Sequence, residues 1–243
     1  MNVQTLIERS ALFAVNHSGG KDSQAMFAKV KAMVPADQIV AVHAVLPEVE
    51  WDGVREHIEA TIGDTPLLIA HATKTFFEMV ESRGKFPSPK YRQCTSDLKR
   101  GPINRELRRY LKANPRFGGL IVNCMGMRAE ESPNRARLQE FKLNAANSKA
   151  GREWYDWLPV HDMLEGEVFA AIREAAQVPH WAYGAGMSRL SCCFCIMAST
   201  ADLTIAAKLN PGLYRRYVKT ERRLDFTLSP SMRSLPEITG IAA

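Results

Sequence analysis

The sequence predicts an α/β protein built on a parallel twisted sheet with helices on both faces, followed by a C-terminal helical extension. Short apolar runs typical of buried strands alternate with segments whose apolar residues recur at helical spacing. Strands that alternate with helices form parallel sheets, because each parallel connection has to cross back over the sheet. The 243 residues, of which 46% are hydrophobic and 24% charged, are enough for one substantial core.

The first half of the chain supplies three of the expected strands. An apolar run at Ala11–Asn16 leads through a serine-glycine turn into a helix at Lys21–Met33, whose apolar residues return at helical spacing. The same alternation continues toward the middle of the chain. In order, we expect a strand at Ile39–Leu46, a helix at Trp51–Ile62, a strand at Pro66–Ala70 and a helix at Thr75–Ser82.

The second half is less regular. The segment Gly84–Gln93 carries two prolines and a glycine and is expected to form a loop, and a basic amphipathic helix follows at Thr95–Leu111. The tail after Ser229 is expected to be poorly packed. Between them we expect a strand at Leu120–Cys124, an irregular segment at Gly126–Arg135, helices at Leu164–Ala176 and within Thr200–Leu224, and a loop at Tyr183–Cys195.

Composition and charge narrow the class of protein. No apolar stretch approaches the ~20 residues of a membrane span, so we expect a cytoplasmic protein without a membrane partner. The net charge of +6 is concentrated in two clusters, which could attract polyphosphate or nucleic acid or could be solvated helix faces. The first cluster is Lys99, Arg100, Arg105, Arg108, Arg109, Lys112 and Arg116, and the second is Arg215, Arg216, Lys219, Arg222 and Arg223.

The hexapeptide Ser18–Ser23, which reads SGGKDS, has the character of an anion site. It stands where a strand feeds a helix, so N–H groups at the helix start and serine hydroxyls can surround a pyrophosphate. It is not the Walker sequence, because the residues that separate glycine from lysine there are missing. A serine-glycine turn that only caps a helix is the alternative without a ligand.

The hexapeptide resembles the SGGxDS signature of the PP-loop ATP pyrophosphatases. This resemblance implies ATP or a related adenine nucleotide as the ligand, with Mg²⁺. Relatives often carry an acid soon after the second strand that is missing here, and Glu48, Glu50 or Asp52 could replace it as a metal ligand. By the resemblance, the β,γ-phosphates are held by Ser18, Gly19, Gly20, Lys21 and Ser23, and Asp22 positions Mg²⁺ or the phosphate cradle.

Two later segments match the same superfamily in order. Arg92–Pro102 resembles the RxCTxxLKxxP segment of phosphoadenosine phosphosulfate reductase-like proteins, which implies that Lys99 faces bound phosphate. Gly126–Arg135 resembles the GxRxxES…R element, which implies that Arg128 and Arg135 face the nucleotide or its leaving group. Cations fixed before the reaction would stabilise the charge on phosphate oxygens, although surface salt bridges are the alternative for the arginines. We expect Lys99 and Arg128 to act from opposite sides of the nucleotide.

The five cysteines do not form the even, spaced set of a disulfide framework. Cys192 and Cys195 form a C-x-x-C pair on a loop, and the resemblance brings Cys94 to the same cleft. Three such thiolates suit a [4Fe–4S] cluster with one open iron, with Cys193 as a fourth ligand or a persulfide carrier. Zinc, a redox dithiol and plain buried cysteines are the alternatives.

The resemblance also suggests which reaction to expect. Sulfonucleotide reductases of this family carry a catalytic cysteine in a C-terminal tail, whereas the last cysteine here is Cys195. The cysteine layout instead resembles the DNA-phosphorothioation sulfurtransferases. We expect an enzyme acting at the α-phosphate, with a nucleic-acid or small acceptor and a sulfur donor such as a cysteine desulfurase. A sulfonucleotide reductase variant and a non-catalytic nucleotide- or nucleic-acid-binding module are the alternatives. Residues 1–180 would form the PP-loop domain and 181–243 the cysteine-bearing extension.

Overall fold

The computed structural model describes residues 1–242 and contains one six-stranded sheet in the order β3-β2-β1-β4-β6-β5. The central strand β1 pairs in parallel with β2 and with β4, and β4 pairs in parallel with β6. The predicted α/β class is confirmed, with one antiparallel strand, β5, at the edge. The strands are β1 Leu12–Asn16, β2 Ile39–Val45, β3 Leu67–His71, β4 Leu120–Cys124, β5 Phe141–Leu143 and β6 Glu153–Trp157.

The chain divides into two compact units. Unit 1 comprises Met1–His43, Arg55–Ile69 and Asn104–His180 and contains most of the sheet. Unit 2 comprises Ala44–Val54, Ala70–Ile103 and the described chain from Trp181 onward. The division into residues 1–180 and 181–243 remains a prediction about domain organisation.

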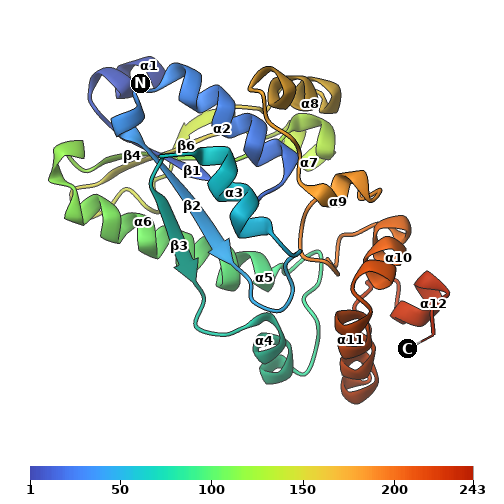
Figure 1. Cartoon of the computed structure of the whole chain (residues 1–243). Coiled ribbons are helices and arrows are strands. Elements are labelled where there is room, and N and C mark those ends of the chain that lie inside the picture. The colour runs from blue at the N-terminus through green and yellow to red at the C-terminus, as the bar shows by residue number, and fades with distance from the viewer. Residues whose placement is uncertain (243) are drawn as a thin grey trace. The chain divides into compact units, whose positions relative to one another are not determined.

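The core of unit 1 lies on both faces of the sheet. All five residues of β4 are buried, and so are the first four of β1. Strands buried on both faces read as continuous apolar runs, which is why these two were evident from the sequence. Helices α2 (Lys21–Met33) and α8 (Glu165–Glu174) contact each other on one face of the sheet, and α6 (Gly101–Ala113) lies on the other (Figure 1).

Strands β5 and β6 were not predicted. The β6 sequence Glu153–Trp157 mixes acidic and aromatic residues, so it lacks the apolar run of a buried parallel strand. Tertiary packing stabilises the pair instead. The ring of Phe141 in β5 stacks on that of Tyr155 in β6, with ring centroids 5.4 Å apart. The antiparallel edge pair therefore depends on contacts between segments that each look irregular.

The expected helix at Thr95–Leu111 is three segments in the structure. A short helix, α5 (Gln93–Thr95), continues into a π-helical segment, η2 (Ser96–Arg100), and then into α6. Pro102 gives the physical reason, because it has no N–H to donate to the carbonyl of Leu98 four residues earlier. π-Helical turns are rare and occur frequently at functional sites.

The prediction of a poorly packed tail is wrong. After α10 (Thr200–Leu209) and α11 (Pro211–Leu224), a further helix, α12 (Leu235–Thr239), lies against α10 and α11. The buried carboxylate of Glu221 accepts hydrogen bonds from the N–H groups of Leu228 (2.8 Å) and Leu235 (2.9 Å). Local sequence gives no sign of this anchor, because the two partners lie 7 and 14 residues away.

The remaining helices are short. A capping box between Thr75 and Glu78 begins α4 (Phe76–Arg83), and Gly84, in the left-handed conformation, ends it. None of the helices formed within residues 1–242 has the length and apolar character needed to cross a membrane. The other α-helices are α1 Val3–Glu8, α3 Val54–Ile62, α4 Phe76–Arg83, α7 Pro133–Ala136 and α9 Trp181–Gly184.

Candidate functional site

The hexapeptide Ser18–Ser23 forms the turn between β1 and α2. Gly19 has φ +78°, a conformation that favours glycine, and Gly20 is the N-cap of α2 without a side-chain cap. Lys21, Asp22 and Ser23 form the first helical turn. The N-terminus of this 13-residue helix therefore opens onto the turn, with the partial positive charge that attracts anions.

Side-chain hydrogen bonds fix the turn from within. The Ser23 hydroxyl donates to the carbonyl of Gly20 at 2.8 Å and accepts the N–H of Ser18 at 3.2 Å. The ring Nδ1 of His17 accepts the N–H of Gly19 at 3.2 Å. Burial, and then the neighbouring rings of His57 and His43, lower the pKa of His17 to about 3. The ring therefore stays neutral and keeps this acceptor at ordinary pH.

Two buried cations lie at this turn. Lys21 is 4% exposed, and its Nζ lies 3.1 Å from Oε1 of Glu165, at the start of α8. Arg128, which follows β4, is also 4% exposed, and its Nε donates to Oδ1 of Asp22 at 2.5 Å. Lys21 also lies 3.9 Å from the other carboxylate oxygen of Asp22. The structure thus brings Arg128 together with the hexapeptide, over 100 residues apart in sequence.

Carboxylates hold Arg128 in its charged form. Arg128 also pairs with Glu130, and its hydrogen bonds to Asp22 and Glu130 outweigh the opposing effect of burial, so that its pKa is raised. The same hydrogen bond from Arg128 lowers the pKa of Glu130. The N–H of Glu165 donates to Glu130 at 2.9 Å, which ties the start of α8 to the segment after β4.

The segment after β4 packs directly on the turn. A Cβ added at Gly126 would lie 3.1 Å from the backbone of Asp22, so glycine is what permits this close approach. Arg135 pairs with Glu131, and its carbonyl accepts from the ring of His161 at 3.0 Å. Arg135 is therefore anchored in the same segment as Arg128.

A second group of predicted residues lies in unit 2. Cys94 is in α5, and Lys99 is half-buried in the π-helical segment that follows. Cys192 and Cys195 are half-buried in the loop before α10. The buried carboxylate of Asp202 in α10 holds the start of this loop, accepting from the N–H (2.8 Å) and the hydroxyl (2.7 Å) of Ser188. The three thiols thus come from two segments about 100 residues apart in sequence.

The pKa shifts show which thiols share surroundings. The thiolate charge of Cys192 is the largest cause that raises the pKa of Lys99, and Cys195 and Cys94 raise it further. Burial raises the pKa of Cys192 to about 11, against the opposing effect of Lys99. Burial likewise raises the pKa of Cys94, and Lys99 again opposes it. Three thiols and one ammonium group therefore interact in one place.

Cys193 has different surroundings from its neighbours. Its side chain is fully buried, its N–H donates to the carbonyl of Val49 at 2.8 Å, and burial raises its pKa strongly. Its electrostatic neighbours are Cys192, Asp52 and Glu50. Its role as a fourth ligand or persulfide carrier stays a prediction, which burial disfavours because the reactive form is the thiolate.

Tyr217 of α11 contributes a polar atom that sequence reasoning missed. The side chain is fully buried, and its hydroxyl has no hydrogen-bond partner within residues 1–242. An unsatisfied buried hydroxyl costs about 1–3 kcal/mol, and native structures contain few. Burial, and then the charges of the thiolates at 192, 193, 195 and 94, raise the pKa of Tyr217 well above its usual range.

These thiols are not arranged around a single ion. Over residues 1–242, no group of three or more His, Cys, Asp or Glu side chains could hold a metal ion as the side chains stand. Cys124, in β4, is fully buried, and burial strongly raises its pKa. Its thiol therefore stays protonated and packs in the core.

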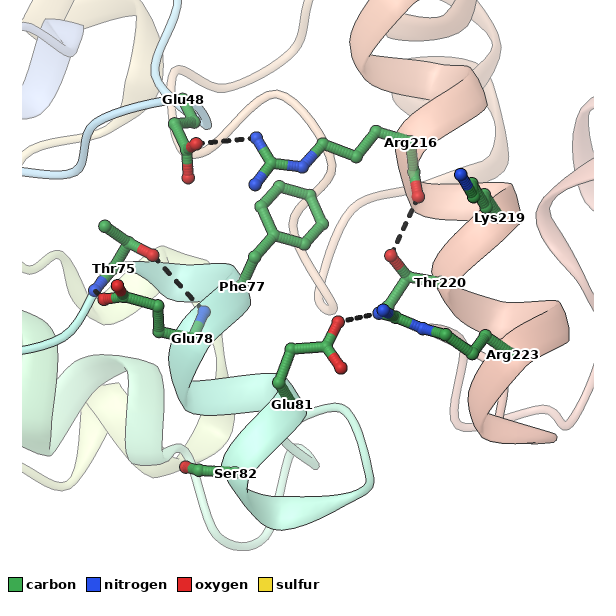
Figure 2. Close-up of a pocket in the computed structure, with 10 residues that line it drawn as sticks. All are labelled: Glu48, Thr75, Phe77, Glu78, Glu81, Ser82, Arg216, Lys219, Thr220 and Arg223. Atoms are coloured by element: carbon green, nitrogen blue, oxygen red, sulfur yellow. Dashed lines mark hydrogen bonds and ion pairs between the residues drawn. The ribbon is translucent and has the colours of Figure 1, made fainter.

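A charged cavity of about 830 Å³ lies in unit 2 and is lined by α4 and α11 (Figure 2). The guanidinium of Arg216 lies 3.9 Å from the ring centre of Phe77 and pairs with Glu48 at 2.7 Å. Arg223 pairs with Glu81, as Figure 2 shows. Two cations of the second basic cluster are thus balanced by carboxylates.

Comparison with known proteins identifies the family. The sequence profile of the phosphoadenosine phosphosulfate reductase domain matches residues 13–198, more than half of the chain. The chain belongs to this family. The match runs from β1 through the hexapeptide and both later motifs into the cysteine loop, where it includes Cys192 and Cys195.

Individual relatives are distant. An uncharacterised 37.8 kDa protein of Escherichia phage 186, from the gpa 5′ region, is 30% identical over 147 residues. The match covers 60% of this chain and 42% of that protein, so the chain spans less than half of this relative.

Two solved structures are similar in backbone. Candida glabrata FMN adenylyltransferase, in complex with FMN and an ATP analogue, shares 13% identity at a TM-score of 0.47. That match covers 74% of this chain and 53% of the enzyme. The phosphoadenylyl-sulfate reductase of Candida auris, in its phosphate complex, shares 12% identity at a TM-score of 0.47, covering 74% of this chain and 80% of that one.

Proposed function

We propose that this reductase-domain protein is an enzyme that acts at the α-phosphate of ATP or a related adenine nucleotide and releases pyrophosphate. The observation that carries the proposal is the pair of buried cations, Lys21 and Arg128, held at the N-terminus of α2. A glycine turn that only capped a helix would not require two buried cations. Burial of a cation is costly unless it is paired, and here both are paired and ordered before any ligand arrives.

The hexapeptide would bind the β,γ-phosphates. Helix-terminal N–H groups and the hydroxyl of Ser18 supply donors, and Lys21 supplies charge. The hydroxyl of Ser23 would join them by turning away from the carbonyl of Gly20. The phosphates would compete with Glu165 for Lys21, because the ammonium lies 3.1 Å from that carboxylate. Asp22, already held by Arg128, would position Mg²⁺ or the cradle itself.

In the reaction, an acceptor oxygen forms a bond to the α-phosphorus while the bond from phosphorus to the bridging oxygen breaks. Pyrophosphate leaves with that electron pair, and the acceptor's proton passes to solvent. Arg128 and Arg135 would stabilise the charge that develops on the leaving group, since both are fixed before the reaction.

The thiols would hold an iron–sulfur cluster. We propose Cys94, Cys192 and Cys195 as ligands of a [4Fe–4S] cluster, with Lys99 balancing their charge. Two observations fit such a cluster. Three half-buried thiols interact with one lysine, and the buried hydroxyl of Tyr217, which has no partner within residues 1–242, could donate a hydrogen bond to a bound group. When bound through three cysteines, such a cluster supplies an iron with an open position. A single tetrahedral ion needs its sulfur ligands within about 3.8 Å of each other, whereas a cluster separates them further.

The cluster and the nucleotide chemistry would serve sulfur transfer. A thiol reductant would release hydrosulfide from the persulfide of a donor such as a cysteine desulfurase and form a disulfide in doing so. The hydrosulfide would attack the atom that bears the adenylated oxygen, and AMP would leave with that oxygen and its electron pair. The acceptor would be a nucleic acid or a small molecule. Exposed cations of α11 without ion-pair partners in the described chain, Arg215, Lys219 and Arg222, support a polyanionic acceptor.

The experiment compares two variants that place the same charge at a helix start. Gly20→Asp puts a carboxylate at the N-cap of α2, a favourable cap that would nevertheless repel phosphate. We expect it to weaken ATP binding at least tenfold by calorimetry and to abolish pyrophosphate release. Gly212→Asp, in the first turn of α11 with open space around it, should change neither. Unchanged ATP affinity in a folded Gly20→Asp protein would remove the hexapeptide from the site.

A further inference from the structure

Tyr217 is the buried polar group that the site described above leaves unexplained. Its side chain is fully buried in α11, and its hydroxyl meets no donor or acceptor anywhere in the described chain. Buried hydroxyls in folded proteins almost always have a partner, so the position calls for one that arrives from outside the polypeptide.

Aromatic rings surround the ring of Tyr217. The rings of Phe77 and Phe194 lie 4.9 and 5.0 Å from its ring, and those of Phe76 and Phe86 lie 5.7 and 6.0 Å away. Phe194 is part of the cysteine loop, between Cys192 and Cys195. The tyrosine ring thus packs on the segment that carries two of the three thiols.

The chain's own sulfurs do not satisfy the hydroxyl. Thiols interact electrostatically with Tyr217, yet none within residues 1–242 lies close enough to accept its hydrogen bond. Protonated thiol sulfur is a weak acceptor, whereas sulfide and thiolate sulfurs that carry negative charge accept well. A group bound by the thiols would place such a sulfur among the cysteines whose charges already act on this hydroxyl.

We infer that Tyr217 donates a hydrogen bond to a sulfur atom of the cluster held by Cys94, Cys192 and Cys195. The inference rests on the proposed cluster and assigns Tyr217 as a positioning residue that tunes it. Reduction adds negative charge to the cluster, and a donor to its sulfur stabilises that charge. The hydrogen bond from Tyr217 therefore raises the reduction potential of the cluster.

The test compares Tyr217→Phe with Tyr214→Phe in anaerobically purified, iron-loaded protein. Tyr214 is a matched control, because it is buried on the same helix and packs on Phe194 at 5.9 Å. Its hydroxyl, however, donates to the carbonyl of Ile241 at 2.6 Å. We expect Tyr217→Phe to keep the wild-type iron count, to shift the midpoint potential to a more negative value and to lose part of the D₂O-induced shift of the iron–sulfur stretching bands. Tyr214→Phe should leave potential and bands unchanged.

Thermal unfolding gives a second readout that does not depend on the potential. In iron-free protein, Tyr217→Phe should be as stable as the wild type or more stable, since it removes an unsatisfied hydroxyl. In loaded protein it should be less stable than the wild type. Iron bound with an unchanged potential and unchanged bands in Tyr217→Phe would overturn this inference alone. Protein without iron would overturn it together with the proposed cluster, while the nucleotide proposal would stand.

Discussion

Cys192 and Cys193 are adjacent in sequence, yet only Cys192 shares its surroundings with Cys94, Cys195 and Lys99. In an extended loop, adjacent side chains point to opposite sides, while an x-x spacing lets the outer residues converge. That argument was available from the sequence and led to three expected ligands. Which side of the loop is buried follows only from packing, since Cys193 is held by its bond to Val49.

Serine substitutions test these residues one at a time. We expect Cys94→Ser, Cys192→Ser and Cys195→Ser to abolish the broad absorption near ~400 nm of thiolate-bound iron clusters and to lower the iron count. Cys193→Ser and Cys124→Ser should keep both, because their thiols lie in other surroundings. Zinc in place of iron in wild-type protein, or iron retained in all three variants, would contradict the assignment.

At the scale of elements, helix boundaries were predicted well where local chemistry sets them. Helix α2 begins and ends at the expected residues, because glycine precedes it and its apolar spacing is regular. The C-terminal helices were merged in the prediction, whereas Pro211 begins α11. Helix α12 was missed, because the carboxylate of Glu221 secures it from another helix.

Glu221 therefore stabilises the whole C-terminal segment. Glu221→Ala removes the acceptor of two buried backbone N–H groups, and we expect the free energy of unfolding to fall by about 2–3 kcal/mol. Glu237→Ala removes the capping box of α12 at an exposed position and should cost less. Chemical denaturation measures both. Equal losses in the two variants would show that Glu221 acts only as a local cap.

At the scale of the whole molecule, histidines with lowered pKa values limit stability in acid. Burial, with smaller effects of neighbouring histidines, lowers the pKa of His17 to about 3 and that of His57 to about 4. In the unfolded chain a histidine titrates near 6.5. Protons therefore bind the unfolded state more tightly, so this contribution to stability is complete above about pH 6.5 and is lost as the pH falls toward 3.

The pH dependence of unfolding tests this directly. Between pH 7.5 and 4.5, His17 alone should account for a loss of about 3 kcal/mol in the free energy of unfolding. His17→Asn, which keeps an acceptor for the N–H of Gly19, should show a shallower loss than the wild type. His71→Gln, at an exposed position, is the control. Parallel curves for His17→Asn and the wild type would refute the coupling.

The sequence by itself determined the α/β class, the hexapeptide, the two later motifs and the outer cysteines, because strand burial, helix spacing and short motifs are local properties. Only the tertiary structure decided that Arg128 bonds to Asp22, that Glu165 lies against Lys21 and that Tyr217 is left without a partner in the described chain. These contacts join residues far apart in sequence. Their occurrence depends on how strands and helices pack, which no local pattern encodes.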